Sequence, residues 1–234
     1  PDEEFSALKY TRPFTEEGGY LPELVIKGDQ IKPEIGGGLC QIGTTLFRMA
    51  MNSGMPITQR RNHSLVVNYY NDLTNGLPGT DATIYDPTPD FKFKNDTGKY
   101  VLIQTYLDME KSQLVFTLWG TNDGRKGSYE APEVKKWIDY GPTKNIETTN
   151  LPVGKTKCQH AYRGAETQFK YLRQLPDGKT EETIFESYYR PLPEICLVGV
   201  EAKVENCFTA EGVPTDNCAP SDSGTPVETP VIVE

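Results

Sequence analysis

Apolar residues recur at helical spacing in one segment near the start of the chain. Between Ile42 and Ala50 they gather on one face of a helix, and Gly54 follows where a helix would end. This pattern predicts a helix over about residues 40–53. The first 35 residues hold only short apolar stretches between Pro and Gly, so we expect loops and short strands there.

Elsewhere the pattern is typical of β-strands. Residues 63–70 and 81–86 are rich in β-forming side chains and predict two short strands. Two apolar runs, 100–108 and 113–121, are separated by a short polar stretch and predict a hairpin. Strand-like segments continue in the second half, with a Pro-Asp-Gly turn between two of them, at 156–164, 166–175, 181–190 and 194–204.

These elements divide the chain into four parts. We expect residues 1–122 to form an α+β domain, in which the main helix packs on an antiparallel sheet in a transglutaminase-like or papain-like arrangement. Residues 123–142 are polar and predict a linker or junction, and residues 143–205 predict a small all-β module. Residues 206–234 are rich in Pro, Thr, Ser, Asp and Glu, which predicts a disordered linker or tail.

Charge and hydropathy exclude some classes of partner. The net charge is −9, from 24 Lys and Arg against 33 Asp and Glu mixed along 234 residues, which argues against nucleic-acid binding. No run approaches the roughly 18 apolar residues of a membrane span. Because the first residue is Pro1 and not Met, we expect a mature or excised fragment, held at a membrane only through a segment not present here.

The cysteines indicate an oxidising compartment. Cys158, Cys196, Cys207 and Cys218 can form two disulfides in three connectivities, of which we prefer Cys158 with Cys196 and Cys207 with Cys218. Paired cysteines in a small β-rich module are typical of extracytoplasmic proteins. Cys40 then has no partner. It is either a reactive thiol or a free, buried structural one.

Cys40 stands where a cysteine becomes nucleophilic. It follows a glycine run and opens the predicted helix, where unpaired N–H groups and the helix dipole favour the thiolate. His63 and Asp81 each begin a predicted strand and can supply a base and a group that orients it. Asp72 and Asp86 are weaker candidates for the orienting role. The alternative is that His63 is a core histidine and Asp81 a turn carboxylate.

Five neighbouring residues are candidates for substrate or oxyanion binding, namely Gly38, Gln41, Thr44, Arg61 and Ser64. Gly38 lets a substrate approach closely, and Gln41, with the cysteine's backbone N–H, could hold an oxyanion. Arg61, with Arg60 beside it, could bind a substrate carboxylate, although a solvated charge pair is an equally good interpretation. Thr44 could instead make only local hydrogen bonds. Because no CxxC or HxxxH pair occurs, we expect neither a metal nor another cofactor.

Four strings occur in the order of a known family. They are GGGLCQIGTTLF, RRNHS, DATIYD and DFKFKND, over roughly residues 4–122. The chain resembles the VanW family of bacterial cell-envelope proteins, named for a gene in certain vancomycin-resistance clusters. Gly43 and Phe47 stand where the family pattern has Ser and Tyr. Residues 143–205 resemble the β-rich G5 module of cell-wall proteins, although the glycine pattern is thin and the cysteines differ.

The resemblance implies an extracellular or cell-surface bacterial protein that works at peptidoglycan, on stem peptides or glycan. Together with the residues it leads to one hypothesis, cysteine-dependent acyl transfer as a transpeptidase or an amidase/peptidase. In this hypothesis Cys40 attacks, His63 acts as base and then acid, and Asp81 orients His63. The alternative is a non-catalytic peptidoglycan-binding or scaffolding protein in which the glycine-rich string is a structural turn.

Overall fold

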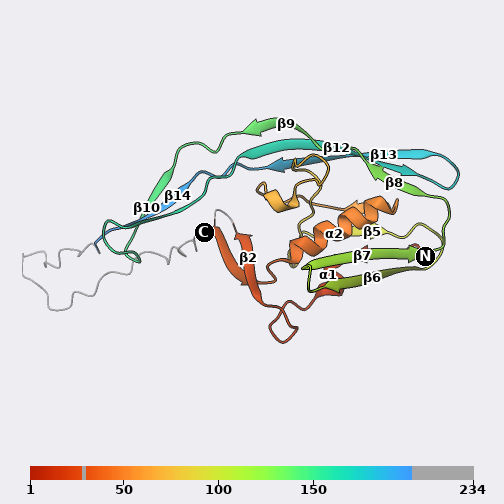
Figure 1. Ribbon diagram of the computed structural model, residues 1–234, viewed down its shortest axis with the longest axis horizontal. Helices are drawn as coiled ribbons and strands as arrows, with labels where there is room; N and C mark the ends of the chain where they lie inside the picture. Colours follow the sequence, from red (N-terminus) through yellow and green to blue (C-terminus); the bar gives the residue numbers. More distant parts are fainter. Residues whose placement is uncertain (28–29, 202–234) are drawn as a thin grey trace, which may run out of the picture.

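The computed structural model describes residues 1–27 and 30–201 (Figure 1). This part of the chain is mostly β, with two α-helices and one short 3-10 helix, η1. In chain order its elements are β1 (Glu4–Ser6), α1 (Ala7–Thr11), β2 (Pro22–Lys27), β3 (Gln30–Ile35), α2 (Leu39–Asn52), β4 (Ile57–Gln59), η1 (Asn68–Tyr70), β5 (Lys92–Lys94), β6 (Val101–Asp108), β7 (Gln113–Gly120), β8 (Lys126–Tyr129), β9 (Glu133–Ile138), β10 (Lys144–Thr148), β11 (Thr156–Gln159), β12 (Gly164–Gln174), β13 (Thr180–Tyr189) and β14 (Ile195–Gly199).

Helix α2 forms where the apolar spacing predicts it. Gly38 is its N-cap, with a φ of 78° in the left-handed region that glycine adopts at little cost. The buried side of the helix presents Leu39, Leu46, Phe47 and Ala50. Gly43 also lies on a crowded side, because a Cβ there would come within 3.0 Å of the Ala82 carbonyl oxygen. The missing side chain lets the backbone near residue 82 lie directly against the helix.

The core surrounds α2 on two sides. In Figure 1 the long strands β12 and β13 run along one side of the helix, and the β6–β7 hairpin runs along the other. The Phe47 ring lies between these layers, with its centroid 5.4 Å from Phe185, 6.3 Å from Phe169 and 5.7 Å from Phe91. Phe169 and Phe185 belong to the second half of the sequence. One hydrophobic core therefore includes residues from both halves.

Strand β12 organises the largest sheet. It pairs antiparallel with β13 from Ala165↔Tyr189 to Gln174↔Thr180. Its other edge pairs with β8 and then with β9. These two strands lie inside segment 123–142, for which the sequence predicts a linker or junction. The polar segment is thus hydrogen-bonded into the sheet of the second half.

The remaining strands form smaller sheets. The β6–β7 hairpin confirms the prediction for 100–108 and 113–121. Strand β14 pairs parallel with β10 and antiparallel with β11, which agrees with an all-β module in residues 143–205. Residues 206–234, and with them the predicted Cys207–Cys218 disulfide, lie outside the described residues. In the described part, no helix combines the length and the apolar character needed to cross a membrane.

The predicted α+β class, with a main helix on one antiparallel sheet in a transglutaminase-like or papain-like arrangement, is wrong. The described residues form five sheets of two to four strands, and the strands expected at 63–70 and 81–86 are absent. In their place the chain is irregular apart from η1. Its backbone groups bond outside any ladder, as in Thr83 N–H to the Arg61 carbonyl (2.8 Å) and Ala82 N–H to Thr44 Oγ1 (3.1 Å).

Truncation of the Phe47 side chain tests whether the two halves share one core. Because the ring is fully buried among aromatic rings of both halves, we expect Phe47→Ala to lower the free energy of unfolding by about 3–5 kcal/mol. Urea denaturation followed by circular dichroism and by tyrosine fluorescence measures this, and both probes should shift together. Tyr106→Ala, at an exposed position of β6, is the control and should change stability by less than about 0.5 kcal/mol. Two separate transitions, with only one shifted, would contradict a shared core.

Candidate functional site

Cys40 is the second residue of α2, and its thiol faces the segment at residues 83–84. The sulfur lies 3.1 Å from Thr83 Oγ1 and 3.5 Å from the Ile84 carbonyl oxygen. The side chain is half-buried and forms no disulfide. The close approach at Gly43 is what places this segment beside the thiol.

His63 and Asp81 form a buried pair. The His63 Nδ1 atom lies 2.6 Å from Asp81 Oδ2, and the His63 backbone N–H donates to the same oxygen at 2.8 Å. The two residues are 6% and 3% exposed. One carboxylate oxygen thus fixes both the ring and the backbone of the histidine, and it favours the tautomer with a proton on Nδ1.

The other Asp81 oxygen is bound by residues from two distant segments. Arg60 Nη2 lies 3.2 Å from Asp81 Oδ1, and the Tyr189 hydroxyl donates to that oxygen as well. The Arg60 guanidinium also donates to the Gly79 carbonyl (2.6 Å) and to Ser187 Oγ (2.8 Å). A buried carboxylate needs such donors because an unpaired charge is costly away from water. Tyr189 and Ser187 lie in β13, so the second half of the chain completes this network.

Tyr70 fixes the remaining face of the histidine. Its ring stacks on the imidazole, with centroids 4.5 Å apart and planes inclined by 14°. Tyr70 ends η1, the only regular element in the expected strand 63–70. The imidazole is therefore held by a hydrogen bond at Nδ1 and by a ring on one side.

The His63 Nε2 atom is the free position of the ring. It is buried and, among the described residues, has no hydrogen bond of acceptable geometry, including to the Cys40 sulfur. The two groups are nonetheless close enough that each shifts the pKa of the other. Catalytic hydrogen bonds are often long in unliganded enzymes and shorten when substrate binds. The imidazole therefore lies between the thiol on one side and the carboxylate on the other.

The electrostatics favour an ion pair between the thiol and the imidazole. Burial raises the pKa of Cys40, but the nearby His63 ring with its charge, and the Thr83 hydroxyl, outweigh it, so the net pKa lies below the ordinary value. Burial lowers the pKa of His63, yet Asp81 and Cys40 together raise it to about 9. Burial also raises the pKa of Asp81, but the His63 hydrogen bond and the Arg60 charge bring it down to about 2. Both shifts move the pair toward a thiolate beside an imidazolium.

A cavity of about 580 Å³ opens on this site. Both Cys40 and His63 contribute to its lining, together with three of the five predicted binding residues, Gly38, Arg61 and Ser64. Its walls also include three exposed tyrosines, Tyr69, Tyr85 and Tyr188. The volume suits a small ligand or a segment of peptide.

Two predicted binding residues lie away from this cavity. Gln41 is exposed at the start of α2 and is not part of the lining. Thr44 is buried, and its hydroxyl exchanges hydrogen bonds with the Ala82 backbone at 3.1 and 3.2 Å. Thr44 therefore contacts a segment 38 residues away in sequence, and not the neighbouring turn of its own helix.

The weaker carboxylate candidates also lie elsewhere. Asp72 is buried and accepts hydrogen bonds from Thr80 and from the Thr74 backbone. Asp86 forms an ion pair with Arg12. Sequence reasoning did not single out Tyr70 and Tyr189, and for Arg60 it offered a substrate carboxylate or solvent as the partner. Arg60 adjoins the histidine motif, whereas Tyr189 is more than a hundred residues from Asp81 and carries no local signal.

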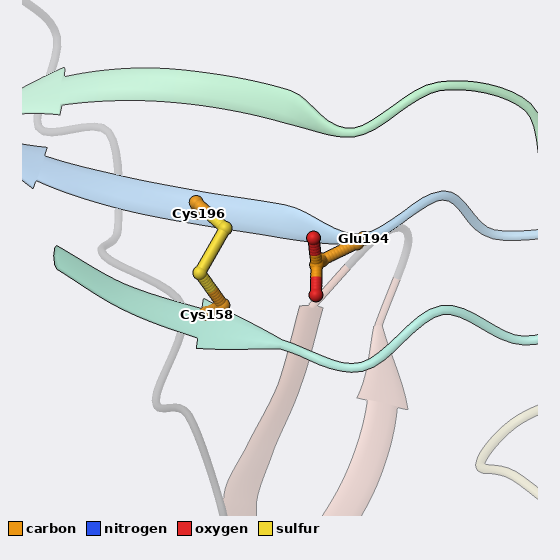
Figure 2. Close-up of side chains that lie close together, drawn as sticks. All are labelled: Cys158, Glu194 and Cys196. Atoms are coloured by element: carbon orange, nitrogen blue, oxygen red, sulfur yellow. A yellow bond between two sulfur atoms is a disulfide. The ribbon is translucent and has the colours of Figure 1, made fainter.

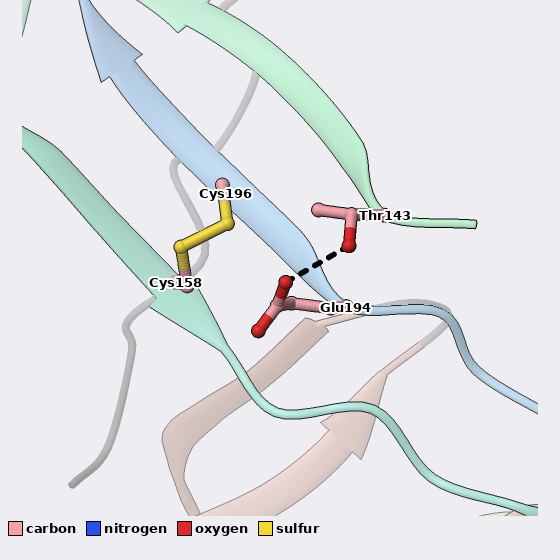
Figure 3. Close-up of a disulfide and its surroundings, with 4 residues drawn as sticks. All are labelled: Thr143, Cys158, Glu194 and Cys196. Atoms are coloured by element: carbon pink, nitrogen blue, oxygen red, sulfur yellow. Dashed lines mark hydrogen bonds between the residues drawn. A yellow bond between two sulfur atoms is a disulfide. The ribbon is translucent and has the colours of Figure 1, made fainter.

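The confirmed disulfide joins Cys158 to Cys196, which lie directly opposite each other on β11 and β14 (Figure 2). Glu194 is close to both sulfurs, and its Oε2 accepts a hydrogen bond of 2.9 Å from the Thr143 hydroxyl (Figure 3). Two thiolates and a carboxylate could bind a metal ion, but a disulfide leaves no thiolate for it. In this state the cluster is a covalent link between strands.

Fold and site together define a mostly β protein with a Cys-His-Asp constellation at the start of its main helix. The chain belongs to the family described as VanW like protein, whose pattern matches residues 1–119. Tyr189 and Ser187 lie beyond that match.

Two curated relatives share part of this region. The uncharacterized protein YoaR of Bacillus subtilis (strain 168) is 34% identical over 104 residues, which cover 44% of this chain and 32% of that protein. The vancomycin B-type resistance protein VanW of Enterococcus faecalis (strain ATCC 700802 / V583) is 31% identical over 111 residues, covering 47% of this chain and 40% of that protein. The match thus spans less than half the length of either relative.

Two solved structures also match part of the chain. They are the G5 domain of an IgA1 protease, with a TM-score of 0.22 and coverage of 35% of this chain and 99% of that one, and HP0197-G5, with a TM-score of 0.15 and coverage of 32% and 95%. Both are 19% identical to this chain. Similarity this low carries no argument about fold or function, so the G5-like interpretation rests on the sequence resemblance.

Removal of the Tyr189 hydroxyl tests the contribution of the second half to the site. A hydrogen bond to a charged group contributes about 1.5–3 kcal/mol, so we expect Tyr189→Phe to lower the free energy of unfolding by about that amount at pH 7. Because the folded-state pKa of Asp81 is depressed to about 2, this contribution is present above the unfolded pKa near 4 and is lost as the pH falls toward 2. Urea unfolding at several pH values measures it. Tyr188→Phe is the control, and equal losses in both variants would contradict the assignment.

The pH dependence of alkylation tests the thiol–imidazole pair. Because His63 lowers the pKa of Cys40, the iodoacetamide reaction should reach half its maximal rate below the pH of an ordinary cysteine. His63→Ala should move this midpoint to higher pH and slow alkylation at pH 7. Mass spectrometry of the Cys40 peptide gives the rates. The control is His160→Ala, at the other, exposed histidine, and a midpoint unchanged in His63→Ala would disprove the coupling.

Proposed function

We propose that this protein catalyses cysteine-dependent acyl transfer at amide bonds of peptidoglycan stem peptides, at the surface of a bacterial cell. The observation that carries the proposal is the buried His63, which is bound to Asp81 through Nδ1 and lines the same cavity as Cys40. A nucleophile, a base and a group that orients the base are the three parts that this chemistry needs.

The reaction follows from these positions. The Cys40 thiolate attacks the carbonyl carbon of an amide, and the carbon–sulfur bond forms as the carbonyl electrons move to oxygen. Protonated His63 gives its proton to the leaving nitrogen, the carbon–nitrogen bond breaks, and an amine and a thioester result. His63 then takes a proton from water or from an acceptor amine, which attacks the thioester and releases the thiolate. Water as acceptor gives an amidase or peptidase, and an amine gives a transpeptidase.

The oxyanion of the tetrahedral intermediate needs donors near the start of α2. The first N–H groups of a helix have no partner within the helix and point toward its N-terminus. We assign the Cys40 N–H to this role. The Gln41 N–H is less suitable because it donates to the Gly38 carbonyl at 2.9 Å, and the Gln41 side chain is outside the cavity lining.

The cellular setting is inferred from family and chemistry. A relative in the family carries the name vancomycin B-type resistance protein, which connects it to the cell wall that vancomycin targets. The Cys158–Cys196 disulfide is of the kind that persists in oxidising, extracytoplasmic compartments. Both favour wall peptides as substrates and an extracellular or surface location.

Purified muropeptides test the activity directly. We expect the protein to change the masses of stem peptides by hydrolysis or cross-linking, and Cys40→Ala to abolish this. Loss of general acid–base catalysis in His63→Ala should lower the rate by about 10²–10⁴-fold. His160→Ala should retain full activity, and liquid chromatography with mass spectrometry detects the products.

A sedimentation assay with isolated cell walls separates catalysis from binding. Cys40→Ala should still bind the walls as well as the unmodified protein does, because its fold is intact. If the unmodified protein binds walls but changes no muropeptide, and its Cys40 is inert to alkylation, the non-catalytic binding function replaces the enzymatic one.

A further inference from the structure

The cavity beside Cys40 is positively charged in a protein that is acidic as a whole. Its lining includes the side chains of Arg61, Arg190 and His63. No Asp or Glu occurs among the described residues of the lining. The full chain carries a net charge of −9. Even where the His63 charge is balanced by a Cys40 thiolate, Arg61 leaves a positive charge on the wall. A concave site of one sign attracts ligands of the opposite sign.

Carboxylates next to the lining residues in sequence have partners of their own, and one of them, Glu23, borders the lining residues Gly37 and Gly38. Glu23 precedes Leu24, and its Oε1 accepts the Leu24 backbone N–H at 2.9 Å. Asp86 follows Tyr85 and pairs with Arg12. Asp81 lies behind His63, outside the lining, where Arg60 and Tyr189 bind it. None of these three carboxylates is part of the cavity wall.

Arg61 is the cation available to a ligand. Its side chain is exposed and, within the described part of the chain, forms no hydrogen bond or ion pair. Its backbone is fixed, because its carbonyl accepts the Thr83 N–H at 2.8 Å. The neighbouring Arg60 is the opposite case, since its guanidinium is buried and bound to Asp81, Gly79 and Ser187. Arg60 thus binds groups of the protein itself, whereas Arg61 lines the cavity together with His63.

We propose that Arg61 binds a free carboxylate of the substrate, so that the site acts on peptide amide bonds close to a carboxylate and not on neutral internal segments. This rests on the proposed function, because it specifies the substrate of the same cysteine. A guanidinium binds a carboxylate through two parallel hydrogen bonds and thereby fixes its orientation. The exposed rings of Tyr69, Tyr85 and Tyr188 supply apolar walls for the rest of the peptide.

Binding to a chemically inert site tests this without catalysis. In a Cys40→Ser background, N-acetyl-alanyl-alanine in its L,L and D,D forms is titrated against the corresponding C-terminal amides by NMR. For at least one form we expect the carboxylate to bind about tenfold more tightly than the amide, as expected for a charge-assisted hydrogen bond. Arg61→Gln should reduce this preference to less than about twofold, and the preference should weaken as salt is added.

Arg163→Gln is the matched control, because Arg163 is partly exposed, pairs with Asp139 and lies outside the cavity lining. It should keep the full preference for the carboxylate. Equal binding of acid and amide, a preference that survives Arg61→Gln, or binding of neutral N,N′-diacetylchitobiose in place of either peptide would overturn the proposal. The last result would make the cavity a glycan site.

Alkylation of the unmodified thiol separates this proposal from the proposed function. Iodoacetate carries a carboxylate and iodoacetamide does not, so Arg61→Gln should slow the iodoacetate reaction of Cys40 by about five- to tenfold and leave the iodoacetamide reaction within about twofold. If both reagents fail to modify Cys40, the proposed catalysis is wrong, and the binding titration still decides whether Arg61 recognises a carboxylate. If both reactions slow equally in Arg61→Gln, the charge does not act on the ligand.

Discussion

The rest of the site depends on the hydrogen bonds and the ion pair that hold the buried carboxylate of Asp81. An ionised carboxylate removed from water is stable only when donors surround it. Here the donors are the ring and backbone of His63, the guanidinium of Arg60 and the hydroxyl of Tyr189. Three stretches of chain far apart in sequence must therefore converge on one point. This convergence turns the histidine toward the cavity and holds irregular backbone in place without a sheet.

A consequence is that the site does not belong to the family-matched region alone. Residues 1–119 contain Cys40, His63 and Asp81. Yet β13 supplies Tyr189, and the aromatic core around Phe47 includes residues of β12 and β13. Because the second half both packs against α2 and donates to Asp81, changes in its sheet reach the histidine through packed side chains. The β module of residues 143–205 therefore supports the site, in addition to any binding function of its own.

The sequence alone was sufficient where the signal is local. The spacing from Ile42 to Ala50 predicted α2, and the paired apolar runs predicted the β6–β7 hairpin. The Cys158–Cys196 disulfide was the preferred pairing among three connectivities, because each cysteine lies in a predicted strand. The sequence failed for the two segments around His63 and Asp81, whose β-forming residues indicated strands. Their backbone groups bond to side chains and loops because the buried carboxylate holds them there. Such a network has no periodicity, and the contact of Tyr189 with Asp81 spans more than a hundred residues.

The composition of the network itself argues that it does more than stabilise the fold. Buried ion pairs are often no more stabilising than apolar side chains of similar volume, because each charge loses its hydration. This chain nevertheless buries Arg60, Asp81 and His63 side by side and leaves the His63 Nε2 without a hydrogen bond among the described residues. An unpaired buried nitrogen costs free energy and gives nothing to the resting fold. A proton exchanged between this atom and a ligand or the Cys40 thiol would account for it, and the adjoining cavity gives a ligand access.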